Sequence, residues 1–361
     1  MSPGGPERTI GPGDRVLVTG GTGFIGSAVV RALVERRAEV LATVQPGADR
    51  MNLAGLDVDT VEADLRDGPA IAAAARDCRY VFHVAAVYRF WSPRPDEFYD
   101  VNVGGTLNVL DAAARAGVER VVYTSTVGTI GLDHSGSNGH GAGREPASEG
   151  HWPRVEHLFG HYKRSKYVAE HEVLRAAAEG LPAVLVQPTL PIGPGDHGPT
   201  PTGRIVLDFL NGRMPAYVDT AMNAVDVDDV AAGHLLAAER GRQGRSYVLG
   251  GENLSFRELL SLLASVTGLP APWLRVPARV TLAAAHVSEI VEGRLVKRHP
   301  TVPLEAVRMA TTRMVYDDSR AREELGYRSR PARQALARSA RWFAENGYVD
   351  ERRLRKLRWA D

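Results

Sequence analysis

The chain has 361 residues, of which 44% are hydrophobic and 24% are charged, and this composition is ordinary for a globular protein of one or two domains. Its formal net charge of +1 gives no electrostatic reason to expect nucleic acid or an anionic membrane as a partner. A single cysteine excludes an internal disulfide and fits a reducing compartment, so we expect a cytoplasmic protein.

No stretch of the sequence predicts a membrane anchor or a secretion signal. The amino terminus lacks the charged-then-apolar pattern of a signal peptide, and no run of about twenty uninterrupted apolar residues is present. Residues 276–291 come nearest, but Arg279, His286 and Glu289 interrupt them, which favours a packed or surface helix over a membrane-docking one. Residues 1–13 are rich in glycine and proline, and we expect them to be disordered.

The first half of the chain alternates short β-rich runs with helical stretches, which is the pattern of a parallel sheet with crossover helices. The predicted strands are residues 15–19, 39–44, 58–62, 80–85, 120–125 and 183–187. The predicted helices are residues 24–37, 67–77, 97–116 and 155–179. We therefore expect an α/β fold with a doubly wound parallel sheet of the Rossmann type.

The second half has a different organisation. Residues 133–150 are rich in glycine and predict a loop, and residues 188–201 are rich in proline and glycine. A strand-then-helix pattern returns at residues 223–240, and short helices dominate from residue 250 onward. We expect a nucleotide-binding domain at residues 14–190, to which the chain returns at residues 223–249. A smaller, mostly helical substrate region would comprise 191–222 and 250–348, with tails at 1–13 and 349–361.

A glycine-rich turn joins the first predicted strand to the first predicted helix. Residues 18–26 read VTGGTGFIG, so three glycines are spaced three apart. Glycines in this context allow a tight turn, a close approach to a diphosphate and close packing of helix on strand, with the diphosphate at the helix N-terminus. We expect a bound dinucleotide here, and the predicted contacts are Gly20, Gly23, Phe24, Ile25 and Gly26.

The choice between NAD and NADP is not decided by the residues after the second strand. An acidic residue there would bind the ribose 2′-hydroxyl of NAD, and an arginine would favour the 2′-phosphate of NADP. The chain has Thr43, Val44 and Gln45 instead, so both cofactors stay open, with NADP slightly favoured. Asp64, after the third strand, can accept from the adenine amino group, or it is an ordinary surface aspartate.

The segment GHYKRSK, residues 160–166, concentrates an unusual residue type. The chain has 44 Lys plus Arg but only four lysines, and two of these follow Tyr162 in this heptapeptide. On a helix, Lys166 shares the inward face of Tyr162, whereas Lys163 lies about 100° round and is expected to be solvated. A neighbouring ammonium and a nicotinamide ring would lower the tyrosine pKa from about 10 toward 7, as acid/base chemistry requires.

Further candidates lie at the carboxyl ends of predicted strands, where ligands bind in such sheets. Ser125 can hold the substrate oxygen, with Thr126 in reserve, although a strand-end serine can also simply cap a turn. Tyr88, Phe90 and Trp91 form an aromatic run that either lines an apolar substrate pocket or packs under the helical region.

Together, the glycine turn, Ser125 and the Tyr162–Lys166 pair resemble the extended short-chain dehydrogenase/reductase superfamily, which includes NAD-dependent epimerases and dehydratases. The resemblance covers roughly residues 14–348. Further matches are Asp64-Leu65, residues 83–86, Asn102, Pro188, and residues 226–234 and 324–327. Within the superfamily the chain is similar to hopanoid-associated sugar epimerases and to dihydroflavonol 4-reductases, through residues 82–91, 160–166, 199–204 and 212–219.

The resemblance implies an NAD(P)-dependent oxidoreductase with Ser125, Tyr162 and Lys166 as catalytic trio. Tyr162 would exchange a proton with the reacting oxygen, Ser125 would polarise that oxygen, and Lys166 would bind the nicotinamide ribose. It further implies cofactor contacts from Gln45, Asp64, Leu65, Ala85, Tyr162, Lys166 and Pro188. We expect a small-molecule substrate, and a homodimer through the helices at 97–116 and 155–179.

Two positions depart from the relatives. Dihydroflavonol reductases usually have arginine where Gln45 stands, so a preference for NADP does not simply carry over. Nucleotide-sugar epimerases usually have a diphosphate-binding arginine where Met222 stands, and its absence counts against a nucleotide-sugar substrate. Arg204 is the substitute that we include among the predicted substrate residues, and Arg213 or Arg257 are alternatives.

Three functions therefore compete. One is net oxidation or reduction of an alcohol or ketone, with Tyr88, Trp91 and Thr126 at the substrate. The second is a sugar epimerase that retains its cofactor, and the third is a non-catalytic sensor, which the intact trio disfavours.

We expect no metal site, because His157 and His161 have no third ligand at a suitable spacing. Three aspartates suggest calcium, but a helix N-cap explains them better: Asp226, Asp228 and Asp229.

Overall fold

The structure is a computed structural model that describes residues 9–89, 91–132, 145–154, 156, 158–277, 280–282, 307 and 312–360. Several sequence predictions lie outside these residues. They are most of the glycine-rich loop, most of the helix expected at 276–291, Phe90, and the histidines at 134, 140 and 157.

Seven parallel strands form the main sheet, in the order β10-β6-β5-β4-β1-β2-β3. The order reverses between β1 and β4, and this reversal is the crevice where ligands of such sheets bind. The predicted doubly wound sheet is confirmed. Its strands are β1 (Arg15–Thr19), β2 (Glu39–Val44), β3 (Asp59–Glu62), β4 (Tyr80–His83), β5 (Arg120–Thr124), β6 (Ala183–Pro188) and β10 (Ser246–Leu249).

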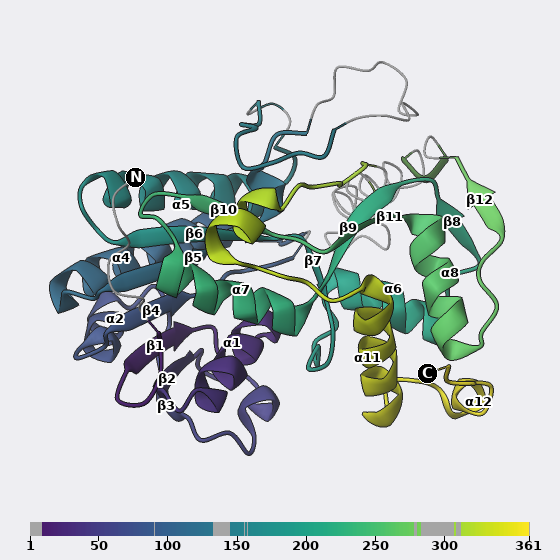
Figure 1. Ribbon diagram of the computed structural model, residues 1–361, viewed down its shortest axis with the longest axis horizontal. Helices are drawn as coiled ribbons and strands as arrows, with labels where there is room; N and C mark the ends of the chain where they lie inside the picture. Colours follow the sequence, from purple (N-terminus) through teal and green to yellow (C-terminus); the bar gives the residue numbers. More distant parts are fainter. Residues whose placement is uncertain are drawn as a thin grey trace.

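Helices cover both faces of the main sheet, as Figure 1 shows. On one face α1 (Phe24–Glu35) packs beside α7 (Val227–Arg240). The apolar sides of both helices share a core with Val16 and Val18 of β1. The other face carries α2 (Gly68–Ala75), α4 (Gly105–Ala116) and α5 (His161–Ala178). Short turns complete this part: η1 (Met51–Leu53), α3 (Asp96–Tyr99), the π-helical η2 (Asp100–Gly104) and η3 (Val127–Thr129).

A second layer of structure lies beyond the carboxyl edge of the main sheet (Figure 1). It contains a three-stranded sheet of β7 (Leu190–Ile192), β9 (Ala221–Asp226) and β11 (Glu252–Ser255), and a pair of β8 (Ala216–Val218) with β12 (Leu274–Val276). Its own core lies between these strands and four helices. These are α6 (Pro201–Leu210), α8 (Phe256–Thr267), α11 (Ala332–Glu345) and α12 (Glu351–Leu354), and η6 (Ala321–Leu325) lies near β10.

Four boundaries differ from the sequence predictions. Residues 9–13 are ordered, since Ile10 is 1% exposed and its backbone N–H donates to Glu239. Residues 349–360 are not a free tail, because they include α12 and the Arg358 N–H donates to the Thr267 carbonyl. Of the segment 223–249, expected to return to the nucleotide-binding domain, α7 and β10 lie with the main sheet and β9 lies in the second sheet. The fourth, the start of α5, is described with the site.

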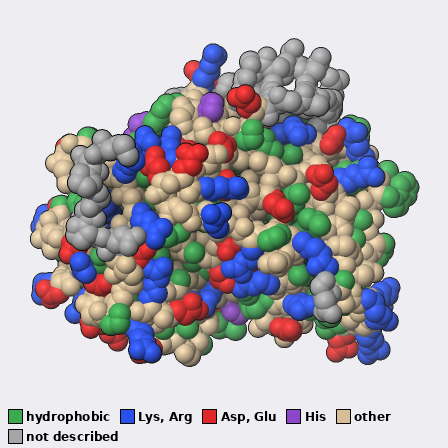
Figure 2. All heavy atoms as spheres, in the orientation of Figure 1, with side chains coloured by type: hydrophobic (Ala, Val, Ile, Leu, Met, Phe, Trp, Pro, Cys, Tyr) green, Lys and Arg blue, Asp and Glu red, His purple; other side chains and the backbone are tan. Residues whose placement is uncertain are grey.

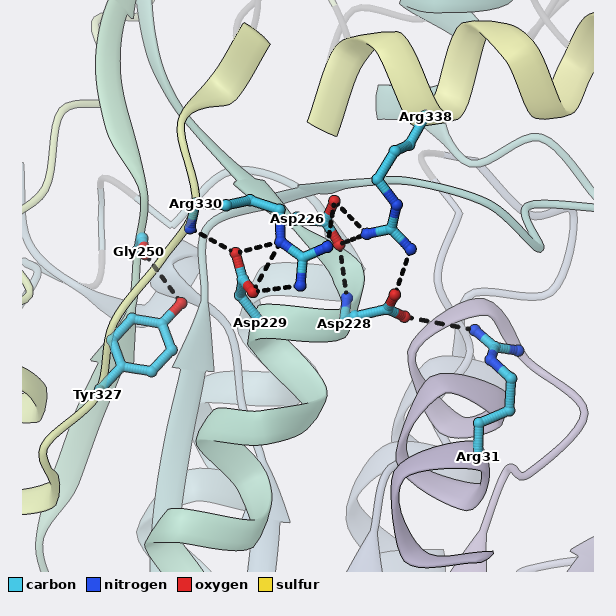
Figure 3. Close-up of polar contacts among 8 residues, drawn as sticks. All are labelled: Arg31, Asp226, Asp228, Asp229, Gly250, Tyr327, Arg330 and Arg338. Atoms are coloured by element: carbon cyan, nitrogen blue, oxygen red, sulfur yellow. Dashed lines mark hydrogen bonds and ion pairs between the residues drawn. The ribbon is translucent and has the colours of Figure 1, made fainter. Parts of the chain in front are cut away.

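A cluster of charged residues fastens the carboxyl-terminal helix α11 to α7 and α1 (Figure 3). Asp226 caps α7 by accepting from the Asp228 N–H, so the predicted N-cap is confirmed. Arg338 of α11 donates to Asp226 at 2.7 and 2.6 Å and also pairs with Asp228, which lies 3.7 Å from Arg31 of α1. The cluster thereby joins the second layer to the helix that follows the glycine turn.

The surface carries both signs of charge. Figure 2 shows basic and acidic side chains interspersed over the face that it draws, and their numbers in the whole sequence nearly balance, at a net charge of +1. Among the described residues, no helix combines the length and the apolar character that crossing a membrane requires.

Candidate active site

A cavity of about 740 Å³ runs along the carboxyl ends of the main-sheet strands and under the second layer. It has room for a dinucleotide and a small substrate together. The structure brings most of the predicted site residues into its wall. These are Gly20, Gly23, Phe24, Ile25, Gly26, Gln45, Asp64, Leu65, Ala85, Tyr88, Ser125, Thr126, Tyr162, Lys166 and Pro188.

The glycine turn leaves backbone exposed at one end of the cavity. Gly20 has φ +72°, and a Cβ there would lie 2.7 Å from the Ala85 Cα, so only glycine fits. A Cβ on Gly26 would lie 2.0 Å from the Gly20 carbonyl oxygen. Gly23 begins α1 without a capping side chain, so the first backbone N–H groups of the helix are open to an anion. These residues fit the diphosphate of a dinucleotide.

The opposite wall of this end is formed by the residues that follow β2 and β3. Asp64 accepts two hydrogen bonds from the Arg66 guanidinium, at 2.9 and 2.6 Å, and this pairing lowers the pKa of the carboxyl. Thr43, Gln45 and Ala48 line the cavity beside the end of β2, and none of them carries a charge. This end of the cavity therefore presents neutral side chains at β2 and an ion pair at β3.

Helix α5 carries Tyr162 and Lys166 into the middle of the cavity. Lys166 is 2% exposed, and its Nζ donates to the Thr124 carbonyl at 2.7 Å. That carbonyl is held in place because the Thr124 hydroxyl bonds to Nε2 of the buried His234 at 2.8 Å. Burial lowers the pKa of Lys166 to about 7, while the nearby Glu170 carboxylate acts in the opposite direction.

The start of α5 differs from the predicted start at residue 155. The helix begins at His161, after Gly160 with φ +81° and ψ +155°, a conformation that favours glycine strongly. Tyr162 is therefore in the first turn of the helix. Its ring packs against that of Tyr88, with centroids 4.8 Å apart, so the predicted aromatic at 88 reaches the site.

Ser125 follows β5 and faces a buried carboxylate. Its hydroxyl donates to Glu170, which is 2% exposed and also accepts from Thr129 Oγ1 at 2.7 Å. The Gln187 side-chain amide donates to the same carboxylate at 3.2 Å. The proton of Ser125 thus points toward Glu170, and an oxygen lone pair remains for a ligand in the cavity.

Asn102 holds the loop that follows β4. Its side chain accepts from the Val87 N–H at 2.8 Å, donates to the Val87 carbonyl at 3.3 Å and donates to Ser165 at 2.9 Å. Ser165 in turn donates to the Tyr162 carbonyl at 2.8 Å. The loop bearing Tyr88 is therefore hydrogen-bonded to α5 through Asn102.

The far end of the cavity is mostly apolar and comes from the second layer. Its described lining residues are Leu190, Pro191, Pro201, Thr202, Ile205, Val218, Thr220, Met222, Phe256, Met314 and Tyr316. Met222 lies in this wall, at the position where the sequence comparison with epimerases placed an arginine. An apolar molecule would be desolvated favourably here.

Three predictions about the site are wrong. Arg204 is exposed and does not line the cavity, because α6 turns Pro201, Thr202 and Ile205 toward it instead. Trp91 is half-buried and is not among the lining residues, because the described residues of this loop that reach the cavity are 84–89. Lys163, expected to be solvated, is half-buried and lines the cavity.

Several residues that shape the site were not predicted from the sequence. Glu170 had a detectable signal, since it lies four residues after Lys166 on the same helical face. Thr129 and Gln187 gave no such signal, because their bonds to Glu170 depend on the pairing of β5 with β6. The residues of the apolar wall come from segments between 190 and 316 that only the folded chain brings together.

A family model described as the NAD dependent epimerase/dehydratase family matches residues 16–250, which is more than half of the chain. The chain belongs to the NAD-dependent epimerase/dehydratase family. This family member is an NAD(P)-dependent enzyme of the extended short-chain dehydrogenase/reductase type.

Relatives of this family member include several reductases. It is 45% identical over 340 residues to a Synechocystis protein named as a dihydroflavonol 4-reductase, covering 93% of this chain and 96% of that protein. It is 36% identical to sterol demethylase protein B of Methylococcus capsulatus, covering 92% and 99%. It is 31% identical to a 2-alkyl-3-oxoalkanoate reductase of Stenotrophomonas maltophilia, covering 87% and 94%.

Solved structures of the family share the fold. A nucleoside-diphosphate-sugar epimerase of Pseudomonas aeruginosa matches with a TM-score of 0.76 and 27% identity, covering 94% of this chain and all of that one. A dTDP-glucose 4,6-dehydratase of Streptomyces venezuelae, solved with NAD and TYD bound, matches with a TM-score of 0.71 and 26% identity, covering 93% and 99%. These neighbours support a nicotinamide cofactor for the present family member.

Proposed function

We propose that the enzyme reduces a ketone on a largely apolar molecule, with Tyr162 as the proton donor. The observation that carries this proposal is the position of Tyr162. It lies between the glycine turn and the apolar wall of one cavity, on the helical face of Lys166. Bound at the glycine turn, the nicotinamide cofactor supplies the hydride. The names of the reductase relatives support the same direction.

Each polar residue of the site has a separate task in this proposal. Tyr162 gives its hydroxyl proton to the substrate oxygen as that oxygen becomes an alcohol. Lys166, held by the Thr124 carbonyl, places a positive charge beside the phenol and favours the tyrosinate that remains. Ser125 can turn its proton from Glu170 to the substrate oxygen, because Thr129 and Gln187 continue to donate to that carboxylate.

The shape and chemistry of the far end favour an apolar substrate over a nucleotide sugar. A sugar nucleotide carries two phosphates, which need positively charged or N–H partners. The described wall at that end instead presents Ile205, Val218, Met222, Phe256 and Met314. Lys163, which also lines the cavity, offers an ammonium rather than the guanidinium fork that binds a diphosphate in two places. An alkyl or aryl ketone would lose water from its apolar surface against these side chains, at about 25 cal/mol per Å² of area.

We infer that NADP(H) is the preferred cofactor. The lining side chains beside the end of β2 are neutral, the Gln45 amide can donate to a 2′-phosphate, and the nearby Asp64 carboxylate is paired with Arg66. Replacing Gln45 with Asp should weaken NADPH binding at least tenfold and leave NADH binding within about twofold. Fluorescence titration of both cofactors measures the two affinities, and equal losses would contradict the assignment.

The alternative, an epimerase that keeps its cofactor, predicts a different outcome in one experiment. Denaturing freshly purified protein and identifying released dinucleotide by mass spectrometry separates the two. A reductase exchanges cofactor at each turnover, so we expect less than stoichiometric release and steady consumption of NADPH with alkyl or aryl ketones. Stoichiometric release, with no net consumption of NADPH, would establish the epimerase instead.

We also infer that two copies of the chain associate through α4 and α5. Apolar residues on the outer sides of these neighbouring helices support this, since Leu107 of α4 is 38% exposed and Val168 of α5 is 41% exposed. Light scattering should give twice the mass of the chain, and Val168→Glu should reduce it to one chain. A monomeric native protein would contradict the inference.

A further inference from the structure

The basic side chains of the protein are unevenly distributed, although the net charge of the whole chain is only +1. The segment that includes most of α12, residues 352–358, reads RRLRKLR and contains five basic residues and no acidic one. Figure 2 shows basic side chains gathered over α12, at the lower right of the view. Four of the five are exposed: Arg352, Arg355, Lys356 and Arg358. This segment is therefore a local concentration of positive charge.

Two carboxylates lie beside the basic segment. Glu351 is 3.9 Å from Arg355. Asp350 is 3.9 Å from Arg213, a further basic residue that balances its charge. All four side chains are more than half exposed, so contact with water makes both pairs weak. A net positive charge therefore remains on this surface, open to solvent.

Exposed apolar side chains accompany the basic segment. Trp359 follows the segment directly and is 38% exposed, while Trp273 is 85% exposed and Leu274 is 46% exposed. The Arg358 N–H donates to the Thr267 carbonyl at 2.8 Å, so the segment packs against the end of α8, shortly before Trp273 in the chain. Figure 1 shows α12 and β12, which begins just after Trp273, at the same end of the molecule.

We propose that this end of the second layer binds the surface of a bilayer that contains anionic phospholipids. The positive charge of residues 352–358 complements the headgroups, and each basic side chain near such a surface strengthens binding about fivefold. The tryptophan rings would enter the boundary between headgroups and acyl chains, where this side chain is enriched. A nucleic acid could also pair with the cations, but only a bilayer offers Leu274 an apolar layer to enter.

The elements of this surface also build the apolar end of the first cavity. Val218 of the cavity wall lies in β8, which pairs with β12, and Phe256 of the same wall begins α8. An apolar molecule dissolved in a bilayer would thus meet the enzyme at the layer that supplies this wall. The proposed surface does not depend on ketone reduction, since its charge and its exposed apolar side chains carry it.

Flotation of the full-length protein with vesicles tests the proposal. The native protein should float with phosphatidylcholine vesicles that contain about 30 mol% phosphatidylglycerol, and should not float with pure phosphatidylcholine. About 0.5 M NaCl should release it, because salt screens the attraction. Combining Arg352→Gln, Arg355→Gln and Lys356→Gln should weaken binding at least tenfold. Trp273→Ala should weaken it at least threefold, because the ring no longer enters the boundary.

The charge-matched control combines Arg15→Gln, Arg37→Gln and Arg76→Gln. These exposed residues lie at the start of β1 and just after α1 and α2, far from the second layer, so this control should bind the vesicles as the native protein does. A native protein that does not float, or equal losses in the two triple variants, would overturn the proposed surface. Retention on DNA without binding to vesicles would assign the cations to nucleic acid and overturn it as well.

Discussion

Glu170 connects two members of the proposed catalytic trio, Ser125 and Lys166. Ser125 donates a hydrogen bond to it, and its charge opposes the burial that lowers the pKa of Lys166 to about 7. Glu170→Gln preserves the shape and removes the charge, so Lys166 should lose its proton at a lower pH. We expect turnover to fall roughly tenfold at pH 7, and the alkaline limb of the pH–rate profile to move about one unit toward acid.

The control for this prediction is Glu172→Gln on the same helix. Glu172 pairs with Arg175 at the surface, at 2.6 Å, and should leave the profile in place. A Glu170→Gln enzyme that lost activity equally at every pH would show that the carboxylate only holds the fold together.

The buried charge of Lys166 also makes the free energy of unfolding depend on pH. Its folded-state pKa of about 7 lies below the ordinary value of 10.5, so the unfolded chain binds more protons between these values. The contribution of this group therefore makes folding more favourable as pH rises from about 7 to 10.5. We expect Lys166→Met to lose turnover yet to raise the free energy of unfolding by about 1–3 kcal/mol at pH 7.

Urea unfolding at pH 7 and at pH 9.5 measures this effect. The advantage of Lys166→Met over the native protein should shrink at the higher pH. An advantage that stayed the same, or a destabilised variant at both values, would contradict the buried-charge account of Lys166.

At the scale of elements, Gly160 sets where α5, the helix that carries Tyr162 and Lys166, begins. Its φ of +81° and ψ of +155° lie in a region that other residues avoid, so Gly160→Ala should cost about 1–3 kcal/mol of stability and shift Tyr162. We expect kcat/KM to fall at least tenfold. Gly180→Ala, with φ +110° beyond the other end of α5, should destabilise without this kinetic loss. Equal kinetic effects would contradict the positioning role.

The sequence predicted the strands and most helices well because their patterns are local. Buried parallel strands such as β1 and β5 are short apolar runs, and the glycine turn lies between a strand and a helix where the chemistry requires it. The start of α5 was predicted wrongly, since a backbone conformation at Gly160 overrides the helical composition around it. The wall containing Phe256 and Met314 had no local signal, because distant segments supply it.

At the scale of the whole molecule, the cluster in Figure 3 holds the second layer against the cofactor-binding part. Asp226 is fully buried, and Arg338 is its main partner, with Arg330 farther away at 3.6 Å. Arg338→Met would leave a buried carboxylate poorly compensated, so we expect a loss on the order of 3–5 kcal/mol in the free energy of unfolding.

Adding Asp226→Asn to Arg338→Met should recover part of that loss, because the amide still accepts from the Asp228 N–H but carries no charge. Urea unfolding of the single and double variants measures the difference. A double variant less stable than Arg338→Met alone would show that the carboxylate is needed for more than its pairing with Arg338.

The most direct test of the central claim follows deuterium from NADPH labelled at nicotinamide C4 to a ketone in a single turnover, in the native enzyme and in Tyr162→Phe. The native enzyme should place deuterium on the new carbinol carbon and release NADP+. Tyr162→Phe should bind NADPH within about twofold of the native affinity and transfer deuterium about 10²–10⁴ times more slowly. Transfer at the native rate by Tyr162→Phe would contradict the assignment of Tyr162 as the proton donor.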